Sequence, residues 1–145
     1  MRTSAPNPAR IFAGGVMYFV LVFGAGFILG SIRIPFMTPR FGERISELIE
    51  MPVMFVVVLL SARFVARRFS LPATTSTRLF VGLIALGLML VAEFLLAVAV
   101  QDRSLGAYIA SRDPISGTVY LAMLVLFGLM PLILARVSLA RERSK

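Results

Sequence analysis

One carboxylate, Glu93, lies within an otherwise apolar stretch that runs from Leu79 to Gln101. An ionised carboxylate in hydrocarbon costs several kcal/mol on insertion scales. The Glu93 side chain must therefore face other helices, find a partner or be protonated. Ionisable residues inside a membrane commonly belong to a binding site or a proton pathway. The alternative is a paired anchor that fixes the register of the helices, and such a pair need not add net stability.

Other charged residues are predicted to lie at the same end of the spans, with Glu93 beneath them. Glu47 and Glu50 are three residues apart, so they share one face if their segment is helical. Arg33 is the best-placed positive charge to pair with Glu93. We expect one polar cluster, in which Arg40 or Arg44 can serve in place of Arg33 if the connecting segment folds inward. Its members are Arg33, Arg40, Arg44, Glu47, Glu50, Glu93, Arg112 and Asp113.

The chemistry open to this cluster is limited. Two carboxylates can act as a general acid and base, but no nucleophile with a neighbouring base stands out. The chain contains neither Cys nor His, which excludes cysteine nucleophiles and metal sites built on thiolate or imidazole. We predict no catalytic, cofactor-binding or metal residues. A pocket for a lipid headgroup, a small cation or a proton fits the cluster better.

The composition indicates that lipid surrounds these residues. The chain has 145 residues, of which 59% are hydrophobic, and its mean hydropathy is +0.92. Soluble domains are about 45–50% apolar, so a soluble fold of this size would leave too much apolar surface exposed. The length fits one domain.

A membrane core requires roughly 20 helical residues per span. Apolar stretches of that length occur at about 11–33, 79–101 and 114–135. A fourth, at about 45–65, is long enough only if Glu47 and Glu50 lie at its edge, and a re-entrant segment is the alternative. We predict an all-α bundle of four membrane helices over residues 11–136. A tail of residues 1–10 precedes it, and a basic tail, 137–145, follows it.

The charges are distributed unequally between the two ends of these spans. With four spans, ten of the 15 Lys and Arg residues flank one end, and the other end carries five Arg balanced by five acidic residues. Lys and Arg are enriched on the cytoplasmic side of membrane proteins. The net charge of +8 therefore predicts orientation, with both termini cytoplasmic, and not nucleic-acid binding. The predicted cluster lies at the opposite, outer end.

Several local signals predict where helices begin and bend. Thr38 followed by Pro39, and Asp113 followed by Pro114, are typical helix starts. A helix that starts at Thr38 would contain Pro52, but Pro52 can equally mark the true start of the second span. Residues 105–109 have the spacing of a short surface helix.

Two further patterns concern the shape and packing of the helices. Pro131 is predicted to kink the last span. Gly26 and Gly30 form a GxxxG pair, a spacing that lets two helices approach closely. We expect this pair to pack inside the four-helix unit, and a dimer interface is the alternative.

The sequence resembles a family of short bacterial inner-membrane proteins to which no activity is attached. The resemblance covers roughly residues 11–136. It rests on FGAGFILGSIR (23–33), PRFGERISELIEMP (39–52), AEF (92–94) and SRDPISGTVYLAML (111–124). It implies a multi-pass protein with four helices in the bacterial cytoplasmic membrane, and it implies no chemistry.

Small multidrug-resistance transporters are similar in size and span number and have a membrane-embedded Glu. Their Glu lies in the first helix, whereas Glu93 lies in the third span here, so their site is not transferred. The leading hypothesis is an accessory or binding subunit that uses the outer cluster. A homo-oligomeric proton-coupled transporter or channel that uses Glu93 is the alternative, and a lipid-modifying enzyme is the third possibility. The expected partners are membrane lipid and either another membrane protein or further copies of the chain.

Overall fold

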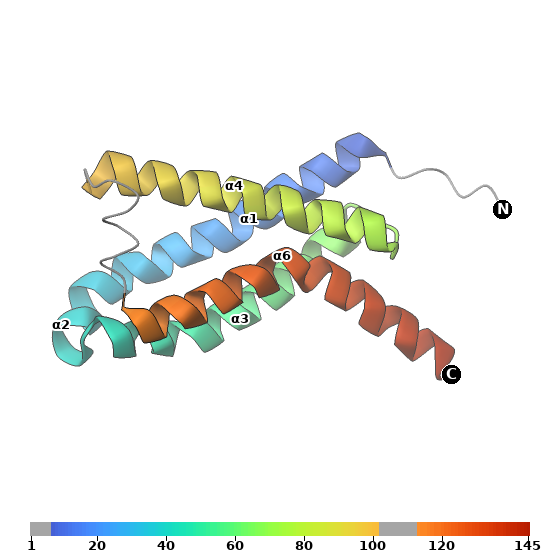
Figure 1. Cartoon of the computed structure of the whole chain (residues 1–145). Helices are drawn as coiled ribbons and strands as arrows, with labels where there is room; N and C mark the ends of the chain where they lie inside the picture. The colour runs from blue at the N-terminus through green and yellow to red at the C-terminus, as the bar shows by residue number, and fades with distance from the viewer. Residues whose placement is uncertain (1–6, 102–112) are drawn as a thin grey trace.

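The computed structural model describes residues 7–101 and 113–145, and this part of the chain is helical without any strand (Figure 1). The elements are α1 (Pro8–Ile32), a π-helical turn η1 (Arg33–Met37), α2 (Thr38–Phe41), α3 (Glu43–Arg68), α4 (Thr75–Gln101) and α6 (Pro114–Arg143). Within the described ranges, four helices are long and apolar enough to cross a membrane. The predicted all-α class is therefore confirmed, and the helices suggest a multi-pass membrane protein.

The helices are longer than the predicted spans. The last one continues to Arg143, so most of the predicted basic tail is helical. The second long helix, α3, begins at Glu43 and contains Pro52 in its interior. The question that the sequence left open is thereby answered, because the helix starts before Pro52.

A short helix, α2, begins at Thr38 as predicted, but Thr38 is not its N-cap, and the helix ends at Phe41 without continuing into the second span. Pro35 has no backbone N–H to donate to the carbonyl four residues earlier, and the chain leaves α1 through the π-helical turn Arg33–Met37. The N–H and the hydroxyl of Thr38 both donate to the Arg33 carbonyl, so Thr38 continues the turn and does not cap a new helix. The chain then reverses at Gly42, whose φ of +82° favours glycine.

The long helices pack side by side. α1 lies against α3 and α4, and α6 lies against the same two helices, which places α1 and α6 diagonally opposite each other. α6 changes direction along its length, between its orange and red parts (Figure 1). Pro131 lies inside α6 and interrupts its hydrogen-bond ladder, which accounts for the predicted bend.

We call the half of the helices around Gly15, Gly82 and Gly128 the inner half, and the half around Arg33, Glu50 and Glu93 the outer half. In the inner half the helices approach closely. A Cβ atom added to Gly15 would lie 2.7 Å from a side-chain atom of Ile84, and one added to Gly82 would overlap the Gly128 carbonyl. Glycine therefore allows α4 to contact both α1 and α6 directly.

Tyr18 connects the diagonal pair of helices at the boundary between the two halves. Its side chain is fully buried, its ring stacks on Phe127 with centroids 4.6 Å apart, and its hydroxyl donates to the Phe127 carbonyl at 2.6 Å. That carbonyl is four residues before Pro131, which has no N–H to offer it. Tyr18 thus supplies the hydrogen bond that Pro131 removes.

Candidate functional site

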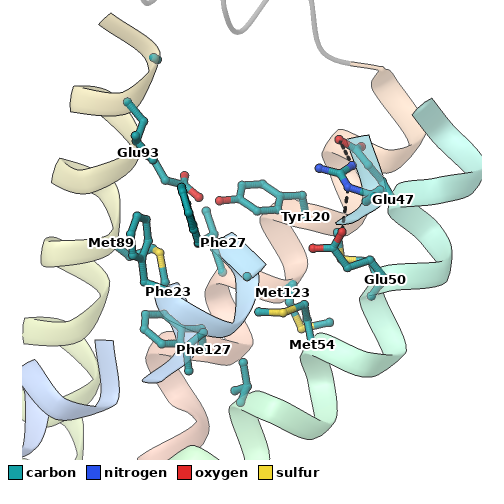
Figure 2. Close-up of a pocket in the computed structure, with 18 residues that line it drawn as sticks. Phe23, Phe27, Glu47, Glu50, Met54, Met89, Glu93, Tyr120, Met123 and Phe127 are labelled. Carbon is teal, nitrogen blue, oxygen red and sulfur yellow. Dashed lines mark ion pairs between the residues drawn. The ribbon is translucent and has the colours of Figure 1, made fainter. Parts of the chain in front are cut away.

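A cavity of about 290 Å³ lies between α1, α3, α4 and α6 in the outer half (Figure 2). Ligand pockets for small molecules occupy about 300–1,000 Å³, so this volume suits a small ligand. The polar residues that line it are Arg33, Glu47, Glu50, Glu93 and Tyr120. Most of the remaining wall is apolar, and Phe127 and Val58 form its buried floor.

Arg33, at the end of α1, forms ion pairs with two carboxylates of α3. Its Nη1 atom lies 3.1 Å from Oε1 of Glu47, and its Nε atom lies 2.8 Å from Oε2 of Glu50. These are the dashed lines in Figure 2. Glu47 and Glu50 are about one turn apart on α3, so one guanidinium can contact both. We call these three residues the Arg33 cluster.

Glu93 enters the cavity from α4, on the side away from Glu47 and Glu50. Figure 2 shows its carboxylate and the Tyr120 hydroxyl of α6 pointing toward each other. Glu93 is only partly exposed, as its position in an apolar helix predicted. The cavity therefore brings Glu93 together with Arg33, Glu47 and Glu50, and it adds a hydroxyl group that the sequence did not single out.

The apolar wall consists mainly of methionine and aromatic side chains. Methionine thioethers are flexible and polarisable, and they adapt to ligands of different shape. Aromatic rings offer a partly negative face to cations. The members of this wall are Phe23, Phe27, Met51, Met54, Met89, Met123 and Phe127.

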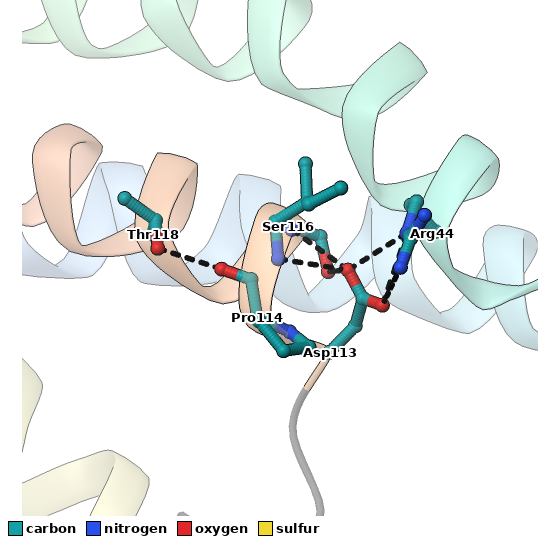
Figure 3. A network of polar contacts seen from close by, with 6 residues as sticks. Arg44, Asp113, Pro114, Ser116 and Thr118 are labelled. Atoms are coloured by element: carbon teal, nitrogen blue, oxygen red, sulfur yellow. Dashed lines mark hydrogen bonds and ion pairs between the residues drawn. The ribbon is translucent and has the colours of Figure 1, made fainter.

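A second polar contact joins the outer ends of α3 and α6 (Figure 3). Arg44 donates to both oxygens of Asp113, with Nη2 to Oδ1 at 2.7 Å and Nε to each oxygen at 3.0 Å. Asp113 also accepts from the N–H groups of Ile115 and Ser116, at 3.1 and 3.0 Å. The predicted helix cap at Asp113 is therefore confirmed. The Arg44 hydrogen bonds and, next, the Ser116 N–H hold the pKa of the Asp113 carboxyl below its usual range.

The predicted polar cluster thus divides into two sets, with the Arg33 cluster and Glu93 at the cavity and the Arg44–Asp113 pair beside it. Arg33 pairs with the α3 carboxylates, although the sequence favoured it as the partner of Glu93. Arg40 is exposed in α2. Arg112 and the surface helix predicted at 105–109 lie outside the described residues.

The two glycines of the predicted packing pair have different surroundings. A Cβ atom on Gly26 would lie 3.5 Å from Cε of Met54, a cavity residue, whereas one on Gly30 would meet nothing within 4 Å. Gly26 therefore faces the cavity. The close helix contacts of the described residues occur at Gly15 and Gly82 instead.

Sequence reasoning missed Tyr120 and the methionines. A usable signal existed, because Met51 and Met54 follow Glu47 and Glu50 on one helix, and Met89 precedes Glu93 by one turn on another. The rotation of each helix about its axis determines which apolar residues face a cavity. The apolar pattern does not define that rotation when the helix is surrounded by lipid, because its outward face is apolar too.

Among the described residues, no group of three or more His, Cys, Asp and Glu side chains is arranged to hold a metal ion. The site combines an apolar body with a charged end, which suits binding of a small amphiphile.

Comparison with protein-family models, curated proteins and solved structures finds no match for this chain.

Proposed function

We propose that this protein is a binding subunit whose ligand occupies the cavity of the outer half. The four long helices would form a membrane bundle in the bacterial cytoplasmic membrane with both termini cytoplasmic. The apolar helices and the unequal charge distribution support this topology, and the family resemblance supports the bacterial setting. The observation that carries the function is the cavity itself, about 290 Å³ between the helices with charged groups along its wall.

The charged residues around the cavity are energetically costly to place between membrane helices, and an ion pair at such a site contributes little net stability. Glu47, Glu50 and Glu93 nevertheless share one cavity wall with Arg33. A purely structural anchor requires one pair in close packing, whereas a cavity beside the charges leaves room for a ligand.

Gly26 allows a direct test of this function. Its missing side chain would point at Met54, so Gly26→Leu should fill part of the cavity. Gly24 lies two residues away on the same helix, and a Cβ there would meet nothing within 4 Å. Gly24→Leu is therefore a matched control that adds the same side chain outside the cavity.

The measurement is native mass spectrometry of the three proteins, each purified from the native host in a mild detergent. The wild type and Gly24→Leu should retain a small ligand in equal amounts, and Gly26→Leu should lose it. Equal retention by all three proteins, or no ligand on any of them, would contradict the proposal. The same spectra show whether the chain assembles with itself or with another membrane protein.

Transport is a second candidate, and the position of Glu93 supports it. This carboxylate faces the cavity from the outer half of the apolar helix α4, where a protonation change can be coupled to ligand release. In proteoliposomes, a transporter should show pH-dependent ligand flux that Glu93→Gln abolishes while folding and assembly persist. Ligand binding without flux would leave the protein as a binding subunit.

A further inference from the structure

We infer that the ligand of this cavity is an amphiphilic organic cation, with a single positive charge on an apolar body. The inference rests on the proposed binding function and specifies its ligand class. It follows from the charge of the cavity wall, from the chemistry of its apolar part and from its size.

The charge of the wall favours a cation. Of the described residues that line the cavity, three are carboxylic acids and one is a base. The base, Arg33, already contacts Glu47 and Glu50 through two of its nitrogen atoms. An anionic ligand would have to displace these carboxylates and would face Glu93 across the cavity. A cation instead adds positive charge to the described part of the wall, where acids outnumber bases.

The apolar part of the wall favours the same ligand. Phe27 and Tyr120 lie beside Glu93 in Figure 2, so a cation next to the carboxylate would also lie near aromatic rings. The thioethers of Met54, Met89 and Met123 offer polarisable contacts to the apolar body. Among the described residues, no three acidic side chains are grouped so that they could hold a metal ion, and the thioethers do not suit hard cations, which prefer oxygen ligands.

Two sources could provide this chemistry. One is a free organic cation that enters from the membrane, and the other is the quaternary ammonium headgroup of a lipid. The cavity volume of about 290 Å³ suits a small ligand or a headgroup, but not a whole phospholipid.

The test compares two probes of one shape. Phenyltrimethylammonium carries a positive nitrogen where tert-butylbenzene carries a neutral carbon. Equilibrium dialysis measures their binding to the full chain in nanodiscs of phosphatidylglycerol. Nanodiscs with Gly26→Leu, in which the new side chain occupies part of the cavity, serve as the reference for partitioning of each probe into lipid.

We expect the cation to bind the wild type at least tenfold more tightly than the neutral probe. Glu93→Gln should weaken cation binding about tenfold and leave binding of the neutral probe unchanged, which shows that the cavity is intact. Glu43→Gln is the matched control, because Glu43 is an exposed carboxylate near the same end and is not part of the cavity wall. It should bind both probes as the wild type does.

Equal affinities for the two probes, or cation binding that Glu93→Gln leaves unchanged, would overturn the ligand class and leave the binding function intact. If neither probe binds, both the ligand class and the proposed binding function are overturned. Nanodiscs of phosphatidylcholine distinguish the two sources. Competition by that lipid identifies a headgroup as the ligand, and unchanged affinity identifies a free cation.

Discussion

The inner and outer halves of these helices use glycine in different ways. In the inner half, Gly82 lies directly against the backbone of Gly128, so α4 and α6 touch without intervening side chains. In the outer half, Gly26 faces Met54 across the cavity, and Gly30 faces open space. A glycine spacing therefore does not by itself identify a helix contact. The group opposite the glycine determines whether the glycine allows close helix packing or leaves space in a cavity.

The halves also differ in what holds the helices together. Close contacts between small and β-branched residues dominate the inner half, where Ala85, Val65 and Val81 are almost fully buried. In the outer half, ion pairs of Arg33 and Arg44 connect the helix ends around the cavity. Substitutions should therefore change stability through shape in the inner half and through unpaired charge in the outer half. Four substitutions test this difference.

The largest effect is expected for Gly82→Ala. The new Cβ would overlap the carbonyl of Gly128, and only movement of α4 away from α6 can relieve that overlap. We expect the free energy of unfolding to fall by about 3 kcal/mol, the upper part of the range for overpacked sites. Unfolding in mixed micelles of a mild detergent and SDS measures this change.

Gly87→Ala is the control for the same helix. A Cβ at Gly87 would meet nothing within 4 Å, so this change should be neutral or stabilising by up to about 1 kcal/mol. Similar losses for the two variants would show that the close crossing at Gly82 has no special role.

Arg33→Gln should have the next largest effect, in the outer half. Without the guanidinium, the carboxylates of Glu47 and Glu50 face each other in a poorly hydrated place. Removal of one partner from a fully buried pair costs about 3–5 kcal/mol. The Arg33 and Glu47 side chains are 19% and 11% exposed, so we expect a smaller loss, about 2 kcal/mol.

The double variant Arg33→Gln with Glu50→Gln sharpens this test. It removes the repulsion between the carboxylates, so it should recover much of the stability that Arg33→Gln loses. A double variant that is less stable than Arg33→Gln would mean that packing, and not charge, governs this region.

Tyr18→Phe tests the boundary between the two halves. The Phe127 carbonyl would lose its hydrogen bond from the Tyr18 hydroxyl, and Pro131 provides no N–H in its place. We expect a loss of about 1 kcal/mol, typical of a hydrogen bond between membrane helices. In a Pro131→Ala background, residue 131 can donate to this carbonyl again, so the same change should cost almost nothing. Additive losses in the double variant would contradict this account.

The sequence was sufficient to predict the helices and the Asp113 cap, but not the ion pairs of Arg33. The helices and the Asp113 cap follow from apolar length and from residues next to each other in the chain. The pairing of Arg33 with Glu47 and Glu50 depends on how α1 ends, because the turn at Arg33–Met37 directs the Arg33 side chain toward α3. Apolar length does not encode that turn.

The cavity was even harder to predict. Its wall consists of residues from several helices, and each helix is apolar on all sides, so no hydrophobic face reveals its rotation. Glu93 was identifiable because it is a single charge in an apolar span. Tyr120 and Met123 were not, since such residues are common in membrane helices whether they face lipid or protein.

The smallest effect is expected at the Arg44–Asp113 pair, which contributes charge at an exposed site beside the cavity. The pKa of Asp113 lies below its ordinary value of 3.8 because Arg44 donates hydrogen bonds to the carboxylate. A lowered folded-state pKa means that the contribution of Asp113 is fully present above the ordinary value and is lost as the pH falls through the folded-state pKa. Thermal unfolding midpoints of the wild type and Asp113→Asn should therefore differ by a few degrees at neutral pH and converge in acid. A difference that stays constant down to the lowest pH at which the detergent complex is soluble would show that Asp113 acts through its neutral hydrogen bonds, and that charge does not stabilise this part of the outer half.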